Sequence, residues 1–262
     1  MLRVETVIAT NAAQAMAGDM AYPLVRIDPR DPEWSAGRIV EFAQRFPLDA
    51  VVAADEEGVV MAAVAARELG LPHNPPEAVR VTRDKAAMRQ VFADAALPQP
   101  LFRVIGADDD PVAACSEVGF PCVVKPVSLS ASRGVIRVDG IDEVADTVAR
   151  IRTITAEAGR DPSEPILAES FVPGTEVALE GLLVDGHLEV LALFDKPDPM
   201  NGPYFEETIL VTPSRLAHHV QDEIAAISGA AADALGLVQG PIHAEARVDG
   251  SRVWLLEVAA RA

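Results

Sequence analysis

The segment PCVVKPVSLSASRG, residues 121–134, decides how the rest of the chain is interpreted. Val123 and Val124 form an apolar run that is typical of a buried strand, with Lys125 at its end before Pro126 stops the strand ladder. A loop rich in hydroxyl groups follows, and residues 135–138 resume a strand. A lysine charge beside loop amides and hydroxyls can hold a polyphosphate. The alternative is an ordinary hairpin with a solvated lysine.

Composition limits the partners that the chain can have. The 262 residues are 50% hydrophobic, which is enough for one large domain or two small ones with a sizeable core. A formal net charge of −18 argues against a general nucleic-acid or anionic-membrane surface. An anionic substrate stays compatible with this charge, because a few lysines in a cleft can reverse the local potential.

The cysteines and the N-terminal residues favour a cytoplasmic location. Cys115 and Cys122 lack metal-ligand spacing and are expected to be reduced thiols. No stretch is long and apolar enough to span a bilayer, and residues 1–12 lack the apolar region of a signal peptide.

Strands and helices alternate over residues 1–74, which predicts a parallel sheet covered by helices. We expect strands at 5–10, 24–27 and 48–54, and helices at 33–45 and 56–69. This region is short for a complete doubly wound domain and opens in the middle of the pattern. His73-Asn74-Pro75-Pro76 has the composition of a linker.

The chain beyond the linker changes character twice. Residues 101–171 have the order strand, helix, strand, strand, helix, strand, which predicts a compact unit that could sit apart as a lid. After Pro173-Gly174 the pattern becomes antiparallel, since Asp185-Gly186 and Asp249-Gly250 each separate two apolar strands and predict β-hairpins. A strand at 208–212 and an alanine-rich helix at 215–235 are expected between the hairpins.

Glu245 and Glu257 lie on the two strands of the second predicted hairpin, which can bring their carboxylates together. Two acidic groups a few ångströms apart repel unless a cation lies between them, and hard oxygen ligands suit Mg²⁺. Glu257 stands inside an apolar run, where a carboxylate usually has a partner. This favours a metal site over the alternative, two solvent-facing acids on an edge hairpin.

Other polar residues are candidates with simpler alternatives. Glu169 and Glu176 flank the turn at Pro173-Gly174, whose backbone could bind the edge of a purine while Glu176 accepts from ribose hydroxyls, although a bare turn is the alternative. Arg261 could bind an acyl or phosphoryl oxygen beside a metal carboxylate, or could fray at the end of the chain.

Three further residues are candidates for which the simpler explanation is the commoner one. His243 shares a strand face with Glu245, although a lone histidine is more often structural. Lys196 and Glu207 lie on or beside a loop rich in proline and glycine, and such loops are usually solvated.

These motifs, in the order in which they occur along the chain, resemble those of the ATP-grasp superfamily. Within it they are most similar to the ATP-dependent carboxylate–amine ligases of the amino-acid ligase type. The resemblance covers about residues 75–262 and is carried by RDKAAMR (83–89), VVKPVSLSASRGV (123–135), LAESFVPGTEVALEG (167–181), GPYFEETILVTP (202–213) and HAEARV…VWLLEVAAR (243–261). It implies an α/β fold that becomes α+β in its C-terminal part. A partial N-terminal domain at 1–74 would precede an ATP-grasp domain at 75–262, with a lid at about 108–171 and an antiparallel C-terminal subdomain at about 172–262.

The resemblance also implies roles for matching residues. The residues that match ATP contacts are Lys85, Lys125, Ser128, Ser130, Ser132, Gly134, Glu169, Phe171, Val172 and Glu176. Glu245 and Glu257 match the ligands of one or two Mg²⁺ ions, with Mn²⁺ as an alternative metal. Arg261 matches the arginine that steadies an acyl-phosphate and is, with Lys196, the candidate catalytic residue. Glu207 and His243 are the candidate substrate contacts.

Three departures from the family pattern matter. The asparagine that commonly follows the second metal glutamate is Ala259 here, so one ligand would be missing or supplied by water. A glycine common in the phosphate loop is Ala131, which is expected to stiffen the lid. The chain also ends at Ala262, where relatives usually continue, so we expect a fragment that could be inactive alone.

The implied activity joins a small-molecule carboxylate and an amine with conversion of ATP to ADP. A bicarbonate-activating enzyme of the biotin-carboxylase or carbamoyl-phosphate type is the second interpretation, although the chain shows no biotin-carrier motif. A non-catalytic nucleotide-binding module is the third, and Ala259 and the truncated end favour it. No nucleic-acid or membrane partner is expected, and a homodimer is one option.

Overall fold

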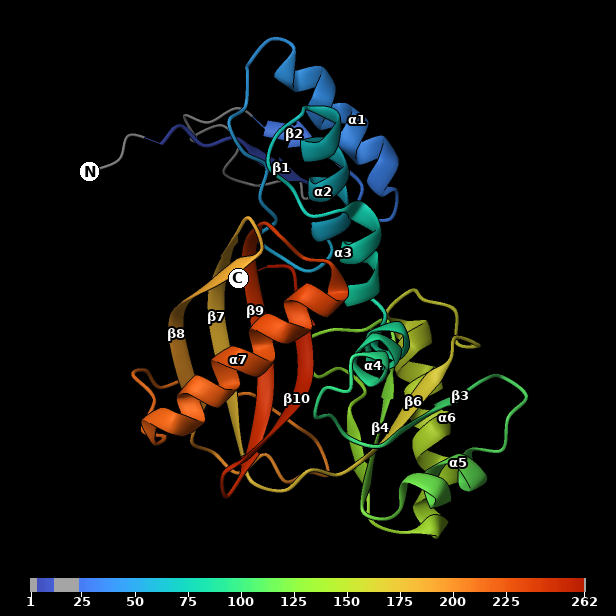
Figure 1. The fold of residues 1–262 in the computed structure, drawn as a ribbon. Coiled ribbons are helices and arrows are strands. Elements are labelled where there is room, and N and C mark those ends of the chain that lie inside the picture. The colour runs from blue at the N-terminus through green and yellow to red at the C-terminus, as the bar shows by residue number, and fades with distance from the viewer. Residues whose placement is uncertain (1–3, 12–23, 262) are drawn as a thin grey trace.

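The computed structural model describes residues 4–11 and 24–261, and these form three sheets (Figure 1). In the smallest sheet, β1 (Ile8–Thr10) pairs in parallel with β2 (Leu24–Arg26). Helix α1 (Pro32–Ala43) packs against β2 and against α2 (Val59–Glu68). The parallel α/β character predicted for this N-terminal region is confirmed.

The strand predicted at residues 48–54 is wrong, because this segment is irregular. Val51 and Ala53 pack against the core while Val52 between them is exposed, so these side chains alternate as in a strand. A strand also needs a hydrogen-bonded neighbour, and the sheet of β1 and β2 offers none to this segment within the described residues.

The second sheet belongs to a unit with its own core. Its elements are β3 (Phe102–Ile105), α5 (Pro111–Val118), β4 (Cys122–Pro126), β5 (Ile136–Val138), α6 (Val144–Glu157) and β6 (Ile166–Ser170), with a 3-10 turn at Ile141–Glu143 before α6. The antiparallel strand order is β3-β6-β4-β5. A hydrophobic cluster running from Ile105 to Ala168 holds α5 and α6 to this sheet. This matches the predicted element order, and the unit from Phe102 to Ser170 is called the lid unit below. The lid boundaries at about 108–171 stay a prediction.

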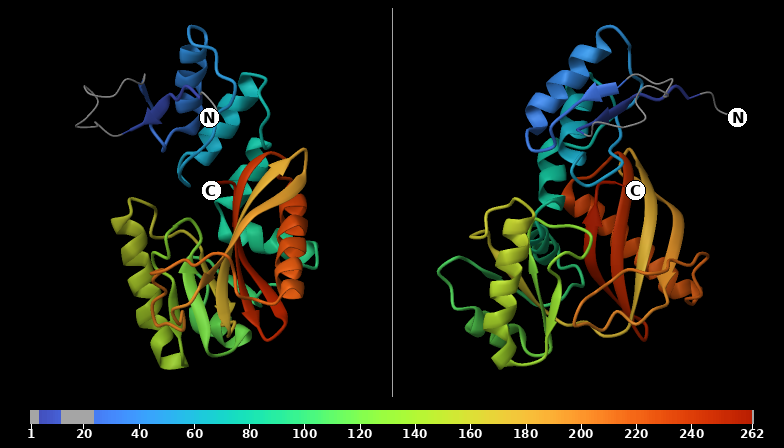
Figure 2. Two further views of the ribbon diagram at one scale, coloured as in Figure 1. Left: turned by 90° about the vertical axis from the view of Figure 1, so that its left-hand side faces the viewer. Right: turned by 180° about the vertical axis from the view of Figure 1, so that it is seen from behind.

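The third sheet contains the two hairpins. Its strands are β7 (Thr175–Val184), β8 (His187–Lys196), β9 (Gly240–Asp249) and β10 (Arg252–Ala259), in the antiparallel order β10-β9-β7-β8. Helix α7 (His218–Leu235) covers one face of this sheet, and the other face is turned toward the lid unit (Figure 2). The short helices α3 (Pro76–Thr82) and α4 (Lys85–Asp94) lead from the N-terminal region to the lid.

The N-terminal region and the third sheet share one hydrophobic core. The cluster includes Val25 of β2, Met61 of α2 and Phe92 of α4, and it continues through α7 to Val258 of β10. These parts are therefore packed as one body, and the lid unit with its separate core stands beside it. No helix of the described residues is long and apolar enough to cross a membrane.

Both predicted hairpin turns form, while the strand predicted at 208–212 does not. Asp185 and Gly186 have φ of +50° and +81°, and Asp249 pairs with Arg252 across Gly250. Of residues 208–212, only Val211 makes a β-bridge, to Asp195 of β8. Strand β8 ends at Lys196, one residue after Asp195, and Pro213 follows directly after residues 208–212. Only one residue of the segment therefore has a strand residue to pair with.

We expect Gly174→Ala to lower the free energy of unfolding by at least about 2 kcal/mol. Gly174 has φ of +100°, and a Cβ atom there would lie 2.0 Å from the Val248 carbonyl oxygen. Chemical denaturation measures the loss, and Gly186→Ala is the matched control, since Gly186 has φ of +81° with nothing within 4 Å of its added Cβ. Equal losses in the two variants would contradict the proposed overlap with β9.

Candidate functional site

A cleft of about 880 Å³ is lined by residues of the lid sheet and by residues of the third sheet. Every candidate residue except Ser128 and Gly134 lines it: Lys85, Lys125, Ser130, Ser132, Glu169, Phe171, Val172, Glu176, Lys196, Glu207, His243, Glu245, Glu257 and Arg261. Residues far apart in the sequence therefore meet in one place.

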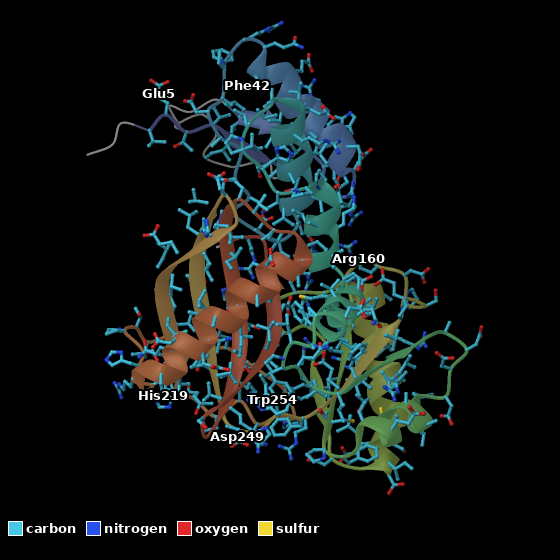
Figure 3. All side chains as sticks on the ribbon, in the orientation of Figure 1. Glu5, Phe42, Arg160, His219, Asp249 and Trp254 are labelled. Carbon is cyan, nitrogen blue, oxygen red and sulfur yellow. The ribbon has the colours of Figure 1, made fainter. Side chains whose placement is uncertain are left out.

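The two exceptions lie in the loop after β4. The Ser128 hydroxyl donates to Glu164 Oε2 at 2.5 Å and lines a second cavity, of about 560 Å³, between the N-terminal region and the lid. Arg160, labelled in Figure 3 at the end of the lid nearest the N-terminal region, lines that cavity too. Gly134 has φ of +76°, and a Cβ atom there would lie 3.1 Å from Pro126 Cδ, so its part in this conformation is to let the loop turn.

The backbone conformation of the same loop explains why alanine at position 131, in place of the glycine common in the family, costs conformational energy. Ala131 and Ser132 have φ of +56° and +53°, a left-handed conformation that glycine adopts without strain. An alanine in this conformation carries strain of about 1 kcal/mol. The loop is therefore strained in this conformation, where a glycine would not be.

The strand register arranges the cleft face of the third sheet in three rows, counted from the hairpin tip at Asp249, which Figure 3 labels. Directly paired residues of neighbouring strands share a face of the sheet. The first row is Lys196, Glu176 and Arg247; the second is Ala178, Glu245 and Glu257; the third is Glu180, His243 and Ala259. Glu245 and Glu257 are thus directly opposite one another, with a bulge between Leu255 and Glu257.

Lys196 is held by three carboxylates from three elements. Its Nζ lies 2.9 Å from Glu176 Oε1, 2.7 Å from Glu245 Oε1 and 2.7 Å from Glu207 Oε1. Burial alone would lower the pKa of Lys196, but the charges of Glu245 and Glu176 raise that pKa well above its ordinary value. Lys196 is therefore a permanent cation that bridges the first and second rows.

The pKa values of Glu176 and Glu245, two of the carboxyl groups beside Lys196, shift in opposite directions. Burial and the neighbouring Glu245 charge raise the pKa of Glu176. Burial acts the same way on Glu245, yet the His243 hydrogen bond and the Lys196 charge hold the pKa of Glu245 far below its usual range. His243 donates Nδ1–H to Glu180 Oε1 at 2.7 Å. Burial alone would lower the pKa of His243, but its hydrogen bonds to Glu180 and Glu245 raise that pKa to about 9. The histidine is thus a cation at neutral pH.

Lys85 and Lys125 face the cleft from the other side. Lys85 Nζ donates to Glu257 Oε1 and to the Leu129 carbonyl oxygen, both at 2.9 Å, and so joins the second row to the loop after β4. Lys125 Nζ lies 2.8 Å from Glu169 Oε2. Burial, and then the Arg89 and Lys85 charges, lower the pKa of Lys125, while Glu169 opposes that shift.

Lysine is used nowhere else in this chain. The sequence contains Lys85, Lys125 and Lys196 and no other lysine, so every remaining basic side chain of the 22 is arginine. The three lysines are 8%, 7% and 4% exposed. Compact ammonium charges are thus confined to the cleft, and the outer surface carries guanidinium groups instead.

Arg89 closes the RDKAAMR motif, but no role for it was predicted from the sequence. Arg89 is 1% exposed, and its Nε lies 2.6 Å from Glu169 Oε1 while Nη2 donates to the Leu256 carbonyl oxygen at 2.7 Å. Burial would raise the pKa of Glu169, but the Arg89 and Lys125 charges hold it at about 2. Glu169 is therefore a buried anion clamped between two cations.

Glu56 was also missed, and nothing in its sequence surroundings marks it. This buried residue precedes α2, and its carboxylate lies 3.0 Å from Arg83 Nη1 and 3.3 Å from Arg261 Nε. The N-terminal region thereby reaches into the cleft and contacts Arg261. The partners lie far apart along the chain, so no local pattern predicts the contact.

Phe171 and Val172 line the cleft where the lid meets the third sheet. The guanidinium groups of Arg137 and Arg247 lie 4.5 and 5.2 Å from the centre of the Phe171 ring. Arg247 Nη1 donates to the Val172 carbonyl oxygen at 2.6 Å, and another Arg247 nitrogen donates to the Met200 carbonyl oxygen. An aromatic ring, apolar side chains and backbone groups therefore gather at this end of the cleft.

The donor set in the second row fits a hard divalent cation. Glu245 and Glu257 offer carboxylate oxygens from opposed positions, and each now holds a lysine. The described residues contain no group of three or more acidic, histidine or cysteine side chains gathered to hold a metal. A metal here would need oxygen ligands from phosphates or water, which is how Mg²⁺ is often bound.

Comparison with known proteins identifies the family. The ATP-grasp domain matches residues 118–262, and the ATP-grasp N-terminal domain matches residues 2–73. The chain belongs to the ATP-grasp family.

The relatives include ligases of amino acids. The alanine–anticapsin ligase of Bacillus subtilis (strain 168) is 30% identical over 241 residues, which cover 86% of this chain and 50% of that protein. The crystal structure of an L-amino acid ligase from Bacillus licheniformis matches with a TM-score of 0.75 at 29% identity, over 91% of this chain and 56% of that one. This chain thus spans about half the length of such relatives.

A third comparison supports the fold alone. The D-alanine–D-alanine ligase from Bacillus anthracis, solved in complex with ATP, has a TM-score of 0.69 at 18% identity, over 97% of this chain and 84% of that one. The ATP-grasp fold expected from the sequence is confirmed by these matches.

We expect Arg89→Met to lower the free energy of unfolding by about 3–5 kcal/mol, because it leaves Glu169 buried with one cation instead of two. Chemical denaturation measures the loss. Arg150→Met, on the exposed face of α6, is the matched control and should change stability by at most about 0.5 kcal/mol. A similar small loss in both variants would show that the buried pair contributes little.

Acid should weaken the protein through Glu169. Its pKa of about 2 in the folded chain lies below the ordinary 4.5, so its stabilisation is complete above pH 4.5 and is lost as the pH falls toward 2. We therefore expect the free energy of unfolding to fall more steeply below pH 4.5 in the wild type than in Glu169→Gln. Parallel curves for the two proteins would contradict this assignment.

Proposed function

We propose that this chain is the nucleotide-binding part of an ATP-dependent carboxylate–amine ligase. The reaction activates a substrate carboxylate as an acyl-phosphate, releases ADP and then forms an amide or peptide bond. The observation that carries the proposal is the convergence of Lys85 and Lys125 on one cleft with the opposed carboxylates of Glu245 and Glu257. A strongly acidic chain that concentrates its ammonium groups in one cleft is suited to bind a polyanion there.

The cleft divides into parts that suit different parts of ATP. The apolar end at Phe171 and Val172, with its backbone groups, suits an adenine base, and Glu176 in the first row suits ribose hydroxyls. Lys85, Lys125 and the loop hydroxyls of Ser130 and Ser132 suit the phosphates. We assign Ser128 and Gly134 to the same loop, whose closing over the phosphates would require Ser128 to leave Glu164.

Glu245 and Glu257 are the proposed ligands of Mg²⁺, with one or two ions and Mn²⁺ as an alternative. A divalent ion bound there would neutralise phosphate charge and orient the terminal phosphoryl group. Binding would release Lys85 from Glu257 and Lys196 from Glu245. Both ammonium groups would then be available to the phosphates or to the substrate.

In the proposed reaction, an oxygen of the substrate carboxylate attacks the γ-phosphorus, the bond to the β-phosphate oxygen breaks, and ADP leaves. Lys125 and Lys85 offset the charge on the leaving phosphate, and Arg261 binds the acyl-phosphate. The amine nitrogen then attacks the acyl carbon and inorganic phosphate leaves. The lid excludes water from the acyl-phosphate, and no covalent enzyme nucleophile is needed.

The full-length protein that contains this chain, supplied with Mg²⁺, ATP and the L-amino acids, singly and in pairs, tests this function. Release of ADP that depends on amino acids, with a dipeptide or amide as product, is the expected result. Release that depends on bicarbonate would favour a bicarbonate-activating enzyme. Tight ATP binding without turnover under any condition would favour a non-catalytic module and contradict the ligase.

We expect Lys125→Met to weaken binding of a non-hydrolysable ATP analogue by at least about 10-fold, because a buried charge-assisted contact to phosphate is lost. Titration calorimetry in the presence of Mg²⁺ measures the change. Arg150→Met removes the same charge from the exposed face of α6 and should leave the affinity unchanged. A similar affinity for Lys125→Met and wild type would place the phosphates elsewhere.

A further inference from the structure

The third row of the cleft face, Glu180, His243 and Ala259, lies beyond the proposed nucleotide site. Neighbouring rows are two residues apart along each strand, which corresponds to about 7 Å. A nucleotide with its ribose at Glu176 and its phosphates at Glu245 and Glu257 extends from the first row to the second. Its terminal phosphoryl group is then directed toward the third row, where the attacking carboxylate has to lie.

Glu180 is incompletely satisfied in this row. Its Oε1 accepts from His243 Nδ1 at 2.7 Å, whereas its Oε2 is buried and has no hydrogen-bond partner among the described residues. A buried acceptor without a donor costs about 1–3 kcal/mol, and more when it is charged. The Glu180 side chain is 26% exposed and lines the cleft. Because the terminal torsion of glutamate is broad, the carboxylate can rotate to present an oxygen to a donor that enters from the cleft.

The surroundings of Glu180 favour a cationic donor. His243 cannot serve Glu180 Oε2, because its Nδ1 is already bonded to Glu180 Oε1 and its Nε2 lies 3.5 Å from Glu245 Oε1. Ala259 has too short a side chain to reach Glu180, and the cleft stays open beside it. A small group bearing several N–H donors therefore fits the row in size and in charge.

The end of the cleft at Arg261 has the opposite charge to Glu180. Arg261 lies two residues beyond Ala259 on the chain and lines the cleft together with Glu180. An α-amino acid is a zwitterion, with a carboxylate and an ammonium group on one carbon. A cleft that offers the guanidinium group of Arg261 and the unsatisfied carboxylate of Glu180 is complementary to both of these charges.

We propose that Glu180 binds the α-ammonium group of the amino acid whose carboxylate is activated, and that His243 holds the Glu180 carboxylate in position. This inference rests on the proposed function and narrows its substrate to an α-amino acid. A simple carboxylic acid or bicarbonate would leave Glu180 Oε2 without its donor. The subsite thus selects for the amino group as well as for the carboxylate.

The test compares an amino acid with its 2-hydroxy acid. The amino acid that gives most ADP with the wild type is assayed as substrate, and its 2-hydroxy counterpart as competitor, for wild type and Glu180→Gln. We expect KM for the amino acid to rise by about 10- to 100-fold in the variant, with the inhibition constant of the hydroxy acid changed less than about threefold. Glu189→Gln, an exposed acid on β8 outside the cleft, should match the wild type.

The outcomes separate the subsite from the function on which it rests. If wild type and Glu180→Gln discriminate equally between amino acid and hydroxy acid, the subsite is overturned while the ligase assignment stands. Equal weakening of both compounds assigns Glu180 a structural role and also overturns the subsite. If the wild type releases ADP with other carboxylates but with no amino acid, the subsite is overturned while the ligase assignment stands. If it releases no ADP with any carboxylate, the proposed function fails and the subsite fails with it. Binding of the ATP analogue to Glu180→Gln, measured by calorimetry, verifies that this variant is folded.

Discussion

The cleft depends on the pairing of each buried cation with a carboxylate from a different element. Lys196 joins β7, β9 and the loop after β8, Lys85 joins α4 to β10, and Arg89 with Lys125 clamps Glu169 of β6. Burying such charges singly would cost several kcal/mol each, so the elements that carry them have to come together. The same pairs hold the anionic and cationic groups of the site together, and a ligand that enters the cleft has to exchange with them.

This charge pairing bridges two bodies whose apolar cores are separate. One core joins the N-terminal region, α4, α7 and the third sheet, and the other belongs to the lid alone. The ion pairs in the cleft between the two bodies can be exchanged for contacts to a ligand without opening either core. The Arg89–Glu169 pair is an exception, since it lies deep and anchors β6 to α4.

Local sequence patterns predicted most of the fold. They failed where the formation of a strand depends on a partner strand that is distant in the sequence. The hairpins at Asp185-Gly186 and Asp249-Gly250 follow from turn chemistry, and the second hairpin sets Glu245 opposite Glu257. Residues 48–54 and 208–212 have suitable side chains but lack partner strands, which no local pattern reveals.

The same limit applies to the candidate site. The motifs indicated which residues would line the cleft, yet Arg89 and Glu56 went unassigned, since their partners lie 80 and 205 positions away. Glu180 was overlooked because it sits within an otherwise ordinary strand. Its significance comes from its register with His243 and from an oxygen that lacks a donor. These are properties of the assembled sheet and are not encoded in any short segment.

The confinement of lysine to the cleft has a practical consequence for chemical labelling. Reagents that acylate primary amines have no surface lysine to modify on this chain, so any side-chain amine that they reach is Lys85, Lys125 or Lys196. Adduct formation at these positions, read by mass spectrometry, would therefore report directly on how open the cleft is. A bound nucleotide or a shut lid would register as protection, without any need to engineer a probe into the protein.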